Sequence, residues 1–176
     1  MGRGRVRATA ARGRGVSGVR IGQGVDAHRL VAGRPLWLAG VEIPHARGLE
    51  GHSDGDVVLH AIASALLGAL GAGDLGTQFP SSDPRWKGAA SATLLGAVHD
   101  LVRERGFAIG NVDATVIAQE PRLAPHREAM VASVARCLGV ESSRVSVKIT
   151  STDGLGAIGR GEGIAAQAVV LIEPAS

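Results

Sequence analysis

Cysteine, tyrosine and long apolar runs are scarce in this chain of 176 residues. Its single cysteine, Cys137, excludes an internal disulfide and any zinc site built from several cysteines. Four aromatic side chains, none of them tyrosine, are too few to stack on the bases of single-stranded nucleic acid. The longest apolar stretch, around residues 61–72, is interrupted by Ser64, Gly68 and Gly71 and is too short to span a bilayer.

Basic residues are concentrated at the N-terminus. The chain has 19 Lys and Arg against 16 Asp and Glu, a net charge of +3 and a pI near 10.0. Residues 1–18 hold five arginines and no acid, so residues 19–176 carry a net charge of −2. The nucleic-acid binding that such a pI suggests would therefore have to act through the N-terminal arm, residues 1–18.

The N-terminal arm alternates Arg, Gly and Ala without hydrophobic periodicity, and we expect it to be disordered. No apolar segment follows its charges, which argues against a secretory signal. Three interpretations stay open: a genuine arm, an organellar transit peptide, and an extension upstream of a true start at Val19, which is slightly favoured. Residues 19–176 are expected to form one domain, since 45% of the chain is hydrophobic.

Strand and helix patterns alternate from Val19 onward. The predicted strands are 19–25, 110–119, 145–150 and 164–172, with a hairpin over 35–44, and the predicted helices are 53–70, 91–105 and 125–138. Ser53 is expected to be the N-cap of the first helix, with Asp54 and Asp56 in its first turn. This order predicts an α/β (α+β) fold: a single domain with a mixed four-stranded sheet, helices packed on one face and a small hairpin.

Three residues from two predicted elements form a candidate zinc site. Asp26 and His28 are two residues apart at a strand end, so both side chains point to the same face. His60 lies in an apolar helix, four residues after Asp56, where a histidine needs a polar partner. Taken singly, Asp26 and His28 could be solvated residues at a strand end, and His60 could be a helix histidine hydrogen-bonded within the core. Together they offer three ligands and leave a fourth position open, which is typical of catalytic zinc.

Two further segments carry groups that suit phosphates. His52 and Ser53 lie at the N-terminus of the first predicted helix, where free N–H groups favour an anion. Residues 148–153 combine a cation, hydroxyls and a carboxylate at a strand end, with several glycines following, which suits phosphate and a hard cation such as Mg²⁺. Such glycine-rich loops are commonly simple turns. Asp74 is interpreted first as a helix cap, and 118–124 as a strand-to-helix connection.

Taken in order, these motifs resemble those of 2-C-methyl-D-erythritol 2,4-cyclodiphosphate synthases, enzymes of the non-mevalonate isoprenoid pathway. The resemblance runs from Arg20 to the C-terminus. Its markers are Asp26-Ala27-His28, His52-Ser53-Asp54-Gly55-Asp56 with His60, Asn111-Val112-Asp113, Ala118-Gln119 and the segment 159–164. Several motifs in one order are far more specific than any one of them.

The resemblance implies an intramolecular phosphoryl transfer. In that family the 2-phosphate of a cytidine diphosphate methylerythritol attacks the β-phosphate, closes a cyclodiphosphate ring and expels CMP. Nucleophile and electrophile share one molecule, so the protein mainly folds the substrate and neutralises charge. The family also implies a homotrimer with active sites between subunits. We expect a cytoplasmic protein without membrane association, and the acidic residues 19–176 and the few aromatic side chains argue against nucleic acid as a partner.

Residue roles follow from the same resemblance. Zn²⁺ would be held by Asp26, His28 and His60, and Mg²⁺ or Mn²⁺ by Asp153. His52 and Ser151 would be catalytic, steadying the transition state, while Asp74 would hold the methylerythritol hydroxyls and 118–124 the cytidine. The implied substrate-binding residues are Asp26, His28, His52, Ser53, Asp56, Asp74, Leu75, Gly76, Phe79, Asp83, Ala118, Gln119, Pro121, Arg122, Leu123, Ala124, Thr150, Ser151, Thr152, Asp153, Ala157 and Arg160.

Three positions depart from the family pattern. Ser151 replaces the usual Thr, Asp153 stands where Glu is frequent, and Ala157 stands where an aromatic residue is frequent near the trimer axis. The zinc ligands are unaffected, but the geometry of the second metal and the axial cavity are expected to differ. Two other functions compete: a zinc phosphohydrolase that activates water, which would give a linear product, and a nucleic-acid-binding protein acting through the N-terminal arm.

Overall fold

The longest strand, β1 (Arg20–Ala32), alternates buried and exposed residues over most of its length. The computed structural model describes residues 18–80 and 88–175, so the predictions for the N-terminal arm, Gly18 excepted, and for Asp83 lie outside the described residues. The predicted strand end at Val25 is wrong, because β1 continues for seven more residues. Residues 26–29 pair with β7 (Gly163–Pro174), and residues 30–32 pair with β4 (Arg47–Leu49). Asp26 and His28 therefore lie inside a strand, on its helix-facing side.

Five strands form the main sheet, in the order β4–β1–β7–β5–β6. β7 (Gly163–Pro174) is antiparallel to β1 and to β5 (Phe107–Ile117), and β5 is parallel to β6 (Val145–Thr150). The prediction of a mixed sheet is confirmed, but its count of four strands is wrong. β4 (Arg47–Leu49) has three residues, too few to show an alternating pattern, and is defined only by its pairing with residues 30–32.

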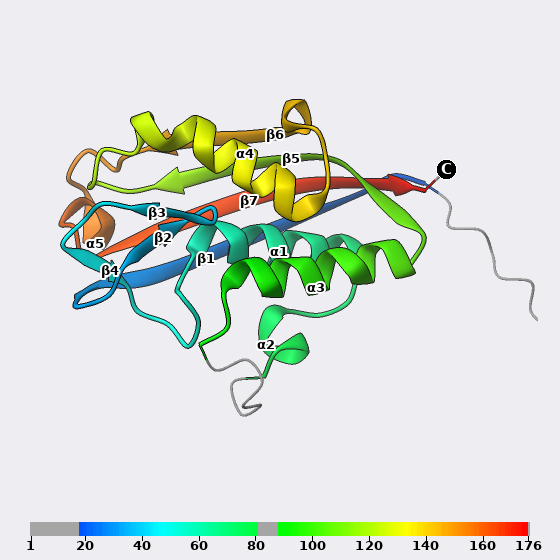
Figure 1. The fold of residues 1–176 in the computed structure, drawn as a ribbon, viewed down its shortest axis with the longest axis horizontal. Helices are drawn as coiled ribbons and strands as arrows, with labels where there is room; N and C mark the ends of the chain where they lie inside the picture. The colour runs from blue at the N-terminus through cyan, green and yellow to red at the C-terminus, as the bar shows by residue number, and fades with distance from the viewer. Residues whose placement is uncertain (1–17, 81–87, 176) are drawn as a thin grey trace, which may run out of the picture.

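Helices cover one face of this sheet, as Figure 1 shows. The three long ones are α1 (Val57–Leu70), α3 (Ser91–Glu104) and α4 (Arg127–Leu138). The short elements are the hairpin of β2 (Leu36–Leu38) and β3 (Val41–Ile43), the helices α2 (Leu75–Gln78) and α5 (Gly156–Gly159), and the 3-10 turns η2 (Ala124–His126) and η3 (Ser142–Arg144). In the part of the chain that the structure describes, no helix has the length and apolar character needed to cross a membrane.

Helix α1 packs unusually close to β1 because glycines face it. A Cβ added at Gly22 would lie 1.8 Å from the carbonyl oxygen of Ala65, and one added at Gly24 would lie 2.2 Å from that of Ala61. No other residue type fits at such distances. The two glycines therefore set how near the α1 backbone lies to the strand that carries Asp26 and His28.

The N-terminus of α1 is capped by Asp56, not by Ser53 as predicted. The Asp56 carboxylate is fully buried and accepts hydrogen bonds of 2.6 to 3.1 Å from the backbone N–H groups of Ala39, Gly40, Val58 and Leu59. It therefore joins the hairpin turn to the start of the helix. Burial raises the pKa of the Asp56 carboxyl, and the hydrogen bonds from Gly40, Leu59 and Ala39 oppose that rise.

Candidate functional site

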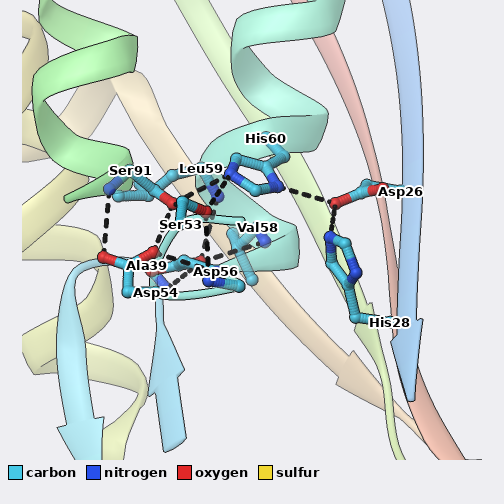
Figure 2. Close-up of polar contacts among 11 residues, drawn as sticks. Asp26, His28, Ala39, Ser53, Asp54, Asp56, Val58, Leu59, His60 and Ser91 are labelled. Carbon is cyan, nitrogen blue, oxygen red and sulfur yellow. Dashed lines mark hydrogen bonds and ion pairs between the residues drawn. The ribbon is translucent and has the colours of Figure 1, made fainter. Parts of the chain in front are cut away.

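Strand β1 and helix α1 bring together one carboxylate and two imidazoles, as Figure 2 shows. Asp26 Oδ2 lies 3.1 Å from His28 Nε2 and 2.9 Å from His60 Nδ1. The three candidate ligand atoms all lie within 4.8 Å of one another. The prediction that Asp26, His28 and His60 form one cluster is confirmed.

The donor atoms of this cluster fit a zinc ion. One carboxylate oxygen with two imidazole nitrogens is a common zinc ligand set. At tetrahedral zinc with bonds of about 2.0–2.1 Å, neighbouring ligand atoms lie about 3.3 Å apart, close to the two measured separations. The side chains of Asp26 and His28 are 25% and 26% exposed and that of His60 is 12% exposed. A bound ion would therefore be reachable from the side of Asp26 and His28.

The electrostatics of the cluster favour a positive charge beside Asp26. Burial opposes ionisation of this carboxyl, but hydrogen bonds from His28 and His60 outweigh burial and hold its pKa well below the usual range. The hydrogen bond to Asp26 raises the pKa of His28, and burial partly offsets that rise. Protonation of the histidines or a bound metal ion would each supply the positive charge that Asp26 favours.

The loop before α1 lies next to the cluster and is held in place by Arg34. The guanidinium of Arg34 donates to the carbonyl oxygens of Gly51 at 3.0 Å and Ser53 at 2.6 Å. The His52 side chain is exposed, whereas the Ser53 hydroxyl is buried and lies 3.2 Å from His60 Nε2. Of these two predicted site residues, only His52 is turned to the solvent.

A second group of predicted residues lies at the ends of the parallel strands β5 and β6. Gln119 Oε1 accepts from the Gly154 N–H at 3.2 Å, and Ser151 Oγ donates to Asp153 Oδ1 at 3.1 Å. Asp153 adopts a left-handed backbone, with a φ of 51°. The structure thus brings the 118–124 segment and the 150–154 loop together. Lys148 is not part of this group, because its ammonium pairs with Asp113.

The two groups lie at the same level of the sheet but on strands that are not neighbours. Ala27 of β1 pairs with Ala165 of β7, which pairs with Ile117 of β5, which pairs with Thr150 of β6. Three strand spacings separate β1 from β6, about 14 Å in all. Within one chain, Ser151 is therefore remote from the histidine cluster.

The remaining predicted residues lie around these two groups. Asp74 caps α2, and hydrogen bonds from Thr77 hold its pKa below the usual value. The Arg160 guanidinium donates to Glu162 at 2.6 Å. Near Asp74, Leu75 and Gly76 lie in α2, and Phe79 directly follows that helix. In the 118–124 segment, Ala118 and Leu123 are buried, Arg122 is exposed, Pro121 follows a cis peptide bond and Ala124 begins η2. Thr152 lies in the 150–154 loop, and Ala157 lies in α5.

Sequence reasoning missed two groups of contacts around the site. Ser91 lies against His60 Nε2, and Asp54 binds Ser91 rather than joining the first turn of α1. Arg47 of β4 forms an ion pair with Glu120, which ties the sheet edge to the 118–124 segment. These partners are far apart in the chain, so no local pattern could reveal them.

Residues 19–173 match the model of the YgbB family. The chain belongs to the YgbB family. A 2-C-methyl-D-erythritol 2,4-cyclodiphosphate synthase of Geobacillus kaustophilus is 59% identical over 154 residues, 88% of this chain and 98% of the relative. A bifunctional enzyme IspD/IspF of Novosphingobium aromaticivorans is 56% identical over 153 residues, and the chain spans 40% of that relative.

Solved structures of the family share the fold. A 2C-methyl-D-erythritol-2,4-cyclodiphosphate synthase described as a CDP-bound form superposes with a TM-score of 0.82 at 41% identity, over 88% of this chain and all of that one. The bifunctional IspDF of Campylobacter jejuni gives a TM-score of 0.86 at 43% identity, over 89% of this chain and 42% of that one. The resemblance and the mixed α/β fold predicted from sequence are confirmed.

Proposed function

We propose that this chain catalyses the ring closure of its family in isoprenoid precursor biosynthesis. In this reaction 4-diphosphocytidyl-2-C-methyl-D-erythritol 2-phosphate is converted to 2-C-methyl-D-erythritol 2,4-cyclodiphosphate and CMP, so the enzyme is a lyase. The observation that carries the proposal is the Asp26, His28 and His60 cluster, in a chain 59% identical to a synthase of this name.

The cluster would hold Zn²⁺, and the exposed carboxylate of Asp153 would hold Mg²⁺ or Mn²⁺. A bound zinc ion supplies a Lewis acid that polarises a phosphate oxygen. Without a metal, Asp26 orients both histidines through its hydrogen bonds. The exposed His52 would contact a phosphate on the open side of the cluster. Ser151, with its hydroxyl held by Asp153, would steady the transferring phosphoryl group.

The substrate would lie between these groups. Asp74 would bind the methylerythritol hydroxyls near Leu75, Gly76 and Phe79, and the cytidine would lie against 118–124 and 150–153, with Ala157 and Arg160 close by. Backbone groups would supply much of the cytidine recognition. Asp56 is left out of the proposed binding set, because its carboxylate is fully buried and already accepts four backbone hydrogen bonds.

A homotrimer would complete the site across subunits. The separation of about 14 Å between β1 and β6 supports this assembly, because one chain cannot place Ser151 beside its own histidine cluster. The sheet face away from the helices also exposes apolar side chains: Ile21 is 69% exposed, Val25 60% and Val169 39%, and Val19, directly before β1, is 57% exposed. An exposed apolar surface of this kind is typical of an interface between subunits.

Product analysis tests the proposed reaction. The full chain is incubated with the cytidylyl substrate, Zn²⁺ and Mg²⁺, and phosphorus NMR follows CMP and the cyclic diphosphate. We expect both products with the wild type, neither with His60→Ala, and both with His99→Ala, a matched control for a half-buried histidine on α3. A linear monophosphate as the product would support the zinc phosphohydrolase instead. Full activity of His60→Ala without zinc would refute the metal assignment.

A further inference from the structure

Both ring nitrogens of His60 are engaged, on opposite sides of the imidazole (Figure 2). Nδ1 faces Asp26 Oδ2, while Nε2 lies 2.9 Å from Ser91 Oγ and 3.2 Å from Ser53 Oγ. A neutral histidine binds a metal through the nitrogen that lacks the proton, so a metal at Nδ1 requires the proton on Nε2. The partners of Nε2 therefore decide whether Nδ1 presents its lone pair.

The hydroxyl proton of Ser91 is already committed to a carboxylate. Ser91 Oγ donates to Asp54 Oδ1, and the Ser91 backbone N–H donates to Asp54 Oδ2 at 3.0 Å. A carboxylate only accepts hydrogen bonds, so Ser91 turns a lone pair toward His60. Ser53 Oγ accepts the N–H of Gly55 at 3.1 Å and lies 3.3 Å from Ser91 Oγ. Because the Ser91 proton is committed to Asp54, the Ser53 hydroxyl is the donor in this contact, and its proton is directed to Ser91 rather than to His60. The surroundings of Nε2 thus favour an N–H that donates to Ser91.

Burial and the position of α3 keep this arrangement in place. Ser91 is 1% exposed, so water does not compete for its hydroxyl. It is the first residue of α3, whose N-cap, Ala90, has no side-chain hydrogen bond. The Asp54 carboxylate supplies the acceptor at this helix end, where the helix dipole favours a negative charge.

We propose that Asp54 and Ser91 are positioning residues for the metal, acting as a relay in which Asp54 orients Ser91 and Ser91 holds the proton of His60 on Nε2. This inference rests on the proposed zinc site. Ser91→Ala leaves only Ser53, at the longer distance, to accept from Nε2. Removing the residue that hydrogen-bonds a metal-binding histidine weakens metal binding about 10- to 100-fold in other metal sites, and we expect an effect in that range here.

Zinc affinity of the purified full chain tests the relay, measured by competition with a chromogenic chelator. Ser91→Ala and Asp54→Asn are each expected to weaken binding about 10- to 100-fold. Because the two residues act in series, the double variant is expected to lose about as much as either single one. The control Ser133→Ala, which also removes a buried serine hydroxyl, is expected to keep wild-type affinity. Wild-type affinity in Ser91→Ala, or additive losses in the double variant, would overturn the relay.

Histidine NMR of the zinc-loaded wild type tests the proton position without any substitution. Two-bond hydrogen–nitrogen correlations of ¹⁵N-labelled His60 are expected to show the proton on Nε2. A proton on Nδ1 would contradict metal binding through that nitrogen. An Nε2 proton without the downfield shift of a hydrogen-bonded ring N–H would contradict the relay, even if every variant failed to fold. His60→Ala separates the two proposals. Zinc binding that survives this change refutes the zinc site itself. If His60→Ala loses zinc binding but Ser91→Ala keeps wild-type zinc affinity, only the relay is refuted.

Discussion

Replacing Gly24 by Ala should weaken the metal site without altering any ligand. Gly24 lies on β1, two residues before Asp26, and an added Cβ would lie 2.2 Å from the carbonyl oxygen of Ala61 on α1. A carbon and a carbonyl oxygen in contact lie about 3.3 Å apart, so the strand and the helix must separate by about 1 Å. Ala61 adjoins His60, and the displacement therefore falls between two proposed ligands.

The expected cost follows from these distances. Overpacking of a well-packed core costs about 1–3 kcal/mol, and metal–ligand distances tolerate errors of about 0.2 Å. We expect Gly24→Ala to lower the free energy of unfolding by about 1–3 kcal/mol in urea titrations with EDTA present. In the chelator competition we expect zinc affinity to fall by about tenfold or more, because the displacement exceeds that tolerance.

A second glycine provides the matched control for this prediction. An added Cβ at Gly96, in the middle of α3, meets no atom within 4 Å. Gly96→Ala should therefore raise stability by up to about 1 kcal/mol through helix propensity and leave zinc affinity unchanged. If Gly24→Ala also kept wild-type zinc affinity, the argument that glycine-mediated packing sets the ligand separation would be refuted.

Three further substitutions and one metal-removal experiment test the cap, the assembly and the metals. Asp56→Ala removes the acceptor of four backbone N–H groups and should cost about 3–5 kcal/mol in urea unfolding, while the folded fraction still forms CMP. Ile21→Arg places charges in the proposed interface, so light scattering after gel filtration should show monomers, with CMP release lost. Asp153→Ala should abolish the Mg²⁺ dependence of turnover but leave zinc affinity unchanged. Dialysis against EDTA should abolish turnover, and added Zn²⁺ should restore it; unchanged activity after metal removal would contradict the metal assignment.

The candidate ligand set was predictable because its geometry is local. Alternation along a strand places Asp26 and His28 on one face whatever the rest of the fold does. His60 was recognisable as a polar residue in an apolar helix that needed a partner. The helix periodicity and the order of the motifs predicted the fold class and the family in the same way.

Local sequence could not decide the start of α1. Ser53, Asp54 and Asp56 are all good N-cap residues, and the choice of Asp56 depends on the N–H groups of the hairpin turn, which approach it only in the folded chain. The fifth strand, β4, was missed for a similar reason, since three residues show no periodicity and only the pairing with β1 defines them.

The sequence alone therefore determined which residues offer metal ligands and to which family the chain belongs. The tertiary structure decided how those residues meet: the glycine-mediated approach of α1 to β1, the contact of Ser91 with His60 across 31 positions, and the separation of the histidine cluster from the 150–154 loop. Contacts between residues remote in the chain leave no periodic signal, because they arise only when the helices pack on the sheet.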